Sequence, residues 1–187
     1  TGEGVVVAVI DEGIDYTHAH FGGPENYATN DPLIIGEPGM TYWPPAALPD
    51  TSLRQMKVIG GFDYVGDDYD AGGTGSALIP APDPDPIGCP YAHGTHVAGT
   101  IAGYGVDASG ATFTGNYTDG DALFPAYPLS SLAQFRIGPG AAPEALLVSL
   151  RVFGCLGSVN TDILLAALDD AGANTYLGED VDVVNMS

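Results

Sequence analysis

Asp11 and His93 are the residues of this sequence whose types and positions suggest acid–base chemistry. Asp11 ends an apolar run at 5–10, and His93 opens a stretch rich in small residues. A carboxylate that accepts the Nδ1 proton of an imidazole fixes its tautomer and leaves Nε2 free to take a proton from a nucleophile. An aspartate after a buried strand also serves as a helix cap or loop anchor. Position alone therefore leaves both roles open for Asp11.

Apolar runs predict the strands that hold these residues. Residues 5–10 are continuously apolar and bounded by glycines, which is typical of a buried parallel strand. Further strands are predicted at 57–65, at 145–152 and from 181 onward. Between them lie segments with little periodicity and many Gly, Pro and Asp residues, which predict irregular insertions at about 22–55, 66–92 and 105–137.

Two segments predict helices. Small residues over 93–104 indicate a helix packed closely against its neighbours. Apolar residues at helical spacing over 163–171 indicate a second, with Asn160 or Thr161 as N-cap and Gly172 as C-cap. The order of strands and helices predicts an α/β fold, a doubly wound and mostly parallel sheet with helices on both faces. Ligands of such sheets bind at the carboxyl ends of the strands, where Asp11 lies.

The net charge and the lengths of the apolar runs argue against nucleic acid and membrane as partners. The 187 residues hold 24 acids against 4 lysines and arginines, a net charge of −20. Such a surface repels phosphate backbones, so we expect no nucleic-acid partner. No run approaches the roughly 18 apolar residues of a membrane span, so we expect no membrane partner. The acids form either a solvated surface or dedicated calcium sites.

Two local strings resemble the signatures of the subtilases, the subtilisin-like serine proteases. They are Val-Ala-Val-Ile-Asp-Glu-Gly-Ile-Asp at 7–15 and His-Gly-Thr-His-Val-Ala-Gly-Thr at 93–100. The segments 140–145, 150–154 and 181–187 also resemble the family. The resemblance implies that Asp11 is the acid and His93 the general base of an Asp-His-Ser triad. It implies a structural role for His96, against the alternative of a His-x-x-His metal pair.

Other positions take their expected roles from the same resemblance. Gly157, Ser158 and Val159 match an edge that pairs with extended polypeptide substrate, and Ser187 matches the start of the opposite wall. Apart from the resemblance, His18 and His20 lie in a loop after the first predicted strand, so they are expected at the surface or in hydrogen bonds rather than in catalysis. Glu12 stands where the family usually has Thr or Ser. Alternation along the strand predicts that its side chain points away from Asp11.

The nucleophilic serine and the oxyanion asparagine of the family lie in strings that follow the last segment seen here. Residues 1–187 are therefore expected to be the N-terminal portion of one subtilisin-like domain, truncated and inactive alone, whose partners are a C-terminal half and a polypeptide substrate. We expect a secreted, extracellular serine endopeptidase. The alternative is a non-catalytic acidic domain that binds peptides or calcium on a degenerate protease fold. No cofactor is expected for catalysis; structural calcium is allowed, without identified ligands.

The two cysteines, Cys89 and Cys155, are expected on one rim of the cleft. Cys89 precedes His93 by four residues, and Cys155 follows the third predicted strand. A secreted context permits a disulfide between them. The alternative is two independent buried thiols.

Overall fold

A computed structural model describes residues 2–23, 25, 57–90, 93–115, 117, 135–173 and 180–187. Most of the insertion predicted at 22–55, and most of the one at 105–137, lie outside the described residues. The insertion predicted at 66–92 is described except for residues 91 and 92. Its described part is irregular apart from a 3-10 turn, η3 (Gly75–Leu78), and an isolated antiparallel bridge from Asp83 to Asp63.

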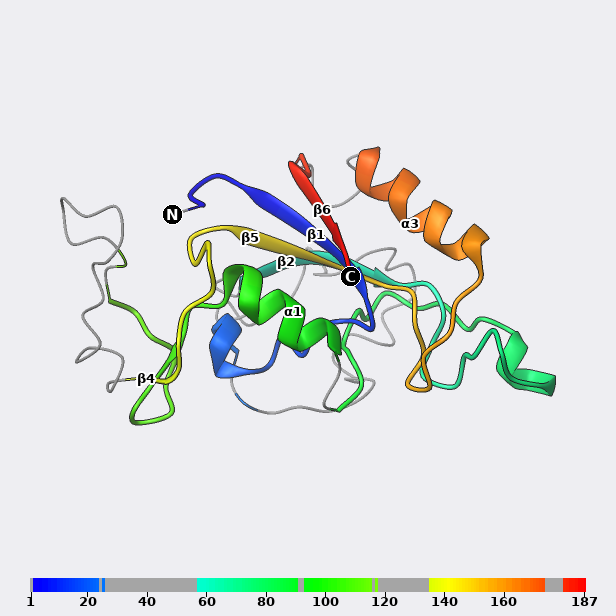
Figure 1. Ribbon diagram of the computed structural model, residues 1–187, viewed down its shortest axis with the longest axis horizontal. Helices are drawn as coiled ribbons and strands as arrows, with labels where there is room; N and C mark the ends of the chain where they lie inside the picture. Colours follow the sequence, from blue (N-terminus) through cyan, green and yellow to red (C-terminus); the bar gives the residue numbers. More distant parts are fainter. Residues whose placement is uncertain are drawn as a thin grey trace.

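A four-stranded parallel sheet forms the centre of the fold (Figure 1). Its order is β2-β5-β1-β6, so strand β1 lies between neighbours that come much later in the sequence. The bounds are β1 Val6–Asp11, β2 Val58–Asp63, β5 Leu146–Arg151 and β6 Val183–Met186. Asp11 and Asp63 both stand opposite Arg151 in register, so three strands end at the same level.

One helix covers each face of the sheet (Figure 1). Alternate residues of a strand point to opposite faces, and β1 divides its side chains accordingly. Val7 and Val9 pack in one apolar cluster with alanines of α1 (His93–Ala102). Val6, Ala8 and Ile10 pack in another with alanines of α3 (Thr161–Gly172). The predicted α/β class, with a mostly parallel sheet and helices on both faces, is confirmed.

Glycine lets α1 approach the end of β1. A Cβ at Gly94 would lie 2.4 Å from the carbonyl oxygen of Gly13 and 3.1 Å from the Cβ of Asp11. Any larger residue would push the first turn of α1 away from the strand end. The second residue of the His-Gly-Thr-His string thus fixes the distance between Asp11 and the helix that carries His93.

Two local predictions need correction. Residues 105–137 are not irregular at their ends, because β3 (Val106–Asp107) and β4 (Phe135–Ile137) pair as a short antiparallel ribbon. Gly172 is the last residue of α3 rather than its C-cap. The cap is Ala173, whose N–H donates to the carbonyls of Asp169 and Asp170.

A buried lysine joins the other end of the sheet to the loop before β5. Lys57 is fully buried, and its Nζ donates to the carbonyl oxygens of Pro143 at 2.7 Å and Ala145 at 2.8 Å. The same ammonium lies 3.8 Å from the centre of the Tyr104 ring. Burial lowers the pKa of Lys57 to about 8.

Candidate active site

Asp11 is held rigidly at the carboxyl end of β1. It is 1% exposed, and its Oδ1 accepts the backbone N–H of Glu12 at 2.8 Å. Both carboxylate oxygens lie 3.0 Å from Nδ1 of His93. The main-chain carbonyl of Asp11 accepts the N–H of Val152 at 2.9 Å, which ties this position to the end of β5. The Asp11 carboxylate can therefore hold the imidazole, while the main chain of Asp11 is fixed by its bond to β5.

His93 is the first residue of α1 and presents its ring to solvent, with a side chain 57% exposed. The hydrogen bond to Asp11 is the largest cause that raises the pKa of His93, and the charges of Asp11 and Glu12 add to it. Because Nδ1 faces Asp11, Nε2 points to the other side of the ring. Among the described residues, no group is hydrogen-bonded to Nε2, so this nitrogen is available to a reacting hydroxyl.

Glu12 does not point away from the pair, and the expectation that it would was wrong. Its Oε2 accepts the backbone N–H of His93 at 2.9 Å. Alternation holds only within the strand, and the chain leaves β1 at Asp11. The Glu12 side chain is therefore free to turn toward the start of α1.

The segment 157–159 lies beyond the end of β5 and is supported from one side by the loop 67–72. Ser158 accepts the N–H of Ala71 at its carbonyl, at 3.3 Å, and the N–H of Gly72 at its Oγ, at 2.7 Å. The same hydroxyl donates to Asp70, and this bond, together with the one from the Gly72 N–H to Asp70, holds the pKa of Asp70 below its usual range. Within the described part of the chain, no backbone hydrogen bond engages Gly157 or Val159, which leaves their amides and carbonyls available to an added strand.

A disulfide joins Cys89 to Cys155, with their Cα atoms 5.7 Å apart. It ties the segment just before His93 to the segment that leads into Gly157. The guanidinium of Arg151 lies behind it and donates to Sγ of Cys89 at 3.1 Å. Arg151 is 2% exposed and pairs with Asp63 at 3.0 Å and Asp67 at 2.8 Å.

The sequence matches the model of the family described as "Subtilase family" (Peptidase S8) over residues 2–187. The chain belongs to the subtilase family. This membership supports a protease-type function. The minor extracellular protease Vpr of Bacillus subtilis (strain 168) is 28% identical over 189 residues, covering 100% of this chain but 14% of that protein. No solved structure matches the chain significantly.

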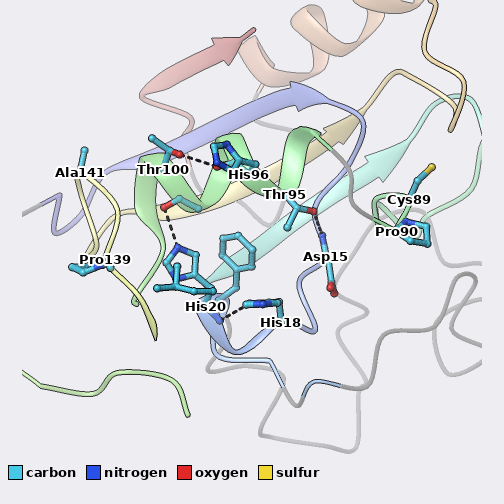
Figure 2. A pocket seen from close by; sticks show the side chains of 14 residues that line it. Asp15, His18, His20, Cys89, Pro90, Thr95, His96, Thr100, Pro139 and Ala141 are labelled. Atoms are coloured by element: carbon cyan, nitrogen blue, oxygen red, sulfur yellow. Dashed lines mark hydrogen bonds between the residues drawn. The ribbon is translucent and has the colours of Figure 1, made fainter. Parts of the chain in front are cut away.

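The other three histidines of this subtilase, His18, His20 and His96, line a cavity of about 1030 Å³ beside α1. Figure 2 shows His20 beneath the helix, bonded to the Gly99 carbonyl at 3.2 Å. Its Nδ1 accepts the N–H of Gly105 at 3.1 Å, and burial lowers its pKa. His18 accepts the N–H of His20, and His96 is exposed. Among the described residues, no side-chain hydrogen bond or ion pair joins any of the three to the Asp11–His93 pair.

Ser187 follows β6 at the carboxyl end of the sheet, where Asp11 ends the neighbouring strand β1. Its hydroxyl donates to Oδ1 of Asn185 at 2.8 Å, and the residue is exposed. The resemblance implied that Ser187 and the 157–159 segment form opposite walls of one substrate site. Ser187 directly follows β6, whereas 157–159 lies in the loop between β5 and α3. Sequence reasoning missed Arg151, because an arginine at the end of an apolar run gives no sign that its partners lie on β2 and in the following loop.

The loop 66–90 carries five aspartates, at positions 67, 68, 70, 83 and 85. Asp67 pairs with Arg151, Asp70 accepts from the Ser158 hydroxyl, and Asp83 accepts the backbone N–H of Asp85. In the described ranges, three metal-ligating side chains converge at Asp67, Cys89 and Cys155. The two sulfurs there are bonded to each other and face a guanidinium, which repels a cation.

No helix among the described residues is long and apolar enough to cross a bilayer.

Proposed function

We propose that this chain carries the acid and base of a subtilisin-type serine endopeptidase, with the nucleophilic serine supplied by polypeptide outside residues 1–187. The observation that supports the proposal is the Asp11–His93 contact, 3.0 Å from Nδ1 to either carboxylate oxygen. Nε2 of His93 takes the serine proton as Oγ attacks the substrate carbonyl. Asp11 stabilises the imidazolium that forms, and His93 then gives the proton to the leaving amine.

The substrate is an extended polypeptide that adds as a strand at the carboxyl edge of the sheet. Gly157 and Val159 offer backbone amides and carbonyls on one side, and Ser187 begins the opposite wall. Recognition through main-chain hydrogen bonds of this kind gives affinity with little dependence on substrate side chains. The loop 67–72 supports this edge from behind through Ser158.

The enzyme acts outside the cell. The disulfide supports this proposal, because disulfides persist in oxidising compartments. The name of the Bacillus relative, an extracellular protease, is in keeping with it.

The test is Asp11→Asn in the full-length protein that carries this chain. An amide at this position cannot orient the imidazole correctly, and the expected loss in kcat is about 10⁴-fold. The matched control is Asp15→Asn, which removes one charge from the same loop without touching His93. A kcat within tenfold of wild type for Asp11→Asn would reject the assignment.

Residues 1–187 alone are expected to be inactive and unlabelled by a serine-directed fluorophosphonate.

A further inference from the structure

Glu12 contacts both members of the proposed pair through different atoms. Its backbone N–H donates to Oδ1 of Asp11 at 2.8 Å, and its side-chain Oε2 accepts the backbone N–H of His93 at 2.9 Å. The second contact spans 81 positions of sequence. A single residue thus links the end of β1 to the first residue of α1.

The start of α1 needs such an acceptor. The first N–H groups of a helix have no partner inside the helix, and a carboxylate near that end is favoured by the helix dipole. The first turn of α1 contains no acidic residue of its own. Glu12 supplies the carboxylate from another segment, at the amide of the residue that also carries the imidazole.

The Glu12 carboxylate also changes the electrostatic environment of the His93 ring. Among the described residues, the charged groups that face His93 are Asp11 at the end of β1 and Glu12 just after it. α1 itself contributes the positive end of its dipole. Glu12 adds a second negative charge near an imidazole that becomes cationic when it accepts a proton.

We propose that Glu12 is a positioning residue for the general base: it anchors the main chain of His93 over Asp11 and favours the protonated ring. This inference rests on the proposed function of His93. The family position usually holds Thr or Ser, whose shorter side chain carries no charge. Glu12 therefore gives this subtilase a different pH range for proton acceptance by His93 than an uncharged Thr or Ser would.

The test separates the charge of Glu12 from its hydrogen bond. In Glu12→Gln the amide oxygen can still accept the N–H of His93, but the charge is gone; in Glu12→Ala both are gone. Glu3→Gln is the control, because it removes the same charge at the opposite end of β1. The full-length protein is labelled at histidine Cε1, the His93 resonance is assigned with His93→Ala, and its pKa is followed by NMR.

We expect the pKa of His93 to fall in both Glu12 variants and to stay at the wild-type value in Glu3→Gln. The acid limb of kcat/KM should move down with it, so Glu12→Gln keeps a larger share of its activity at low pH. Glu12→Ala should in addition lose about 10- to 100-fold in kcat, because the base is misplaced. If Glu12→Ala does not fold, Glu12→Gln alone decides the outcome.

An unchanged His93 pKa and an unchanged acid limb in Glu12→Gln would overturn the inference. The NMR measurement does not depend on turnover, so the two proposals fail separately. If the pKa moves but His93→Ala keeps full activity, the proposed function fails and the contact stands. If His93→Ala is inactive but the pKa does not move, only the inference about Glu12 fails.

Discussion

Asp11 and Arg151 are register partners at the ends of β1 and β5, and each is the last residue of its strand. Asp11 holds the imidazole of His93, whereas Arg151 holds Asp63, Asp67 and the sulfur of Cys89. The main chains are joined by the bond from Val152 N–H to the Asp11 carbonyl. Two adjacent charged residues thus organise the proposed base on one side and the disulfide on the other.

Arg151→Met should destabilise the full-length protein strongly. It leaves Asp63 buried without its cation, and breaking one side of a buried ion pair typically costs about 3–5 kcal/mol. The measurement is the free energy of unfolding in urea. Arg136→Met is the control: Arg136 is exposed, and the effect there should stay within about 0.5 kcal/mol. Equal effects of the two substitutions would show that the Arg151 pairs contribute nothing.

Loss of the disulfide should lower both stability and activity. The bridge closes a loop with a sequence separation of 66, worth about 4 kcal/mol in the chain-entropy model. We expect the Cys89→Ser, Cys155→Ser double variant to unfold at lower urea and to show a reduced kcat/KM. Alkylation before and after reduction, followed by mass measurement, checks the bridge itself. Two thiols that react without reductant in the natively produced protein would contradict the structure.

Lys57 should make stability depend on pH in the alkaline range. Its pKa is about 8 in the fold against 10.5 ordinarily, so the unfolded chain binds more protons between these values. Stability from this group therefore rises as pH rises from about 8 to 10.5, by about 3 kcal/mol in total. Unfolding of wild type and Lys57→Met is compared across this range. If the free energy of unfolding changed with pH in the same way in wild type and in Lys57→Met, the lowered pKa of Lys57 would be refuted.

Loss of the Ser158 hydroxyl should weaken substrate binding more than it slows chemistry. Ser158→Ala removes the contacts to Asp70 and to the N–H of Gly72 that support the 157–159 edge. We expect KM for an extended peptide to rise several-fold with little change in kcat, since the loss affects binding of ground state and transition state alike. Asp68→Asn, an exposed neighbour, is the control. An unaltered KM in Ser158→Ala would exclude this supporting role.

Sequence patterns predicted the central layers of the fold because apolar runs and small residues are local signals. The proposed acid and base came from the resemblance of the strings at 7–15 and 93–100 to the subtilase signatures, since position alone left the role of Asp11 open. The direction of Glu12 could not be read from alternation, because its contact is with a residue 81 positions away. The partners of Arg151 are equally remote in sequence, and β3 is too short for any period to show.

The central claim is that His93, and not His96, is the general base. The most direct measurement is kcat for a peptide substrate in the full-length protein with His93→Ala or His96→Ala, alongside the melting temperature of each. The account predicts a loss on the order of 10⁴–10⁶-fold for His93→Ala at an unchanged melting temperature, and near wild-type turnover for folded His96→Ala. A comparable loss in His96→Ala without a change in stability, or turnover within tenfold of wild type in His93→Ala, would contradict it.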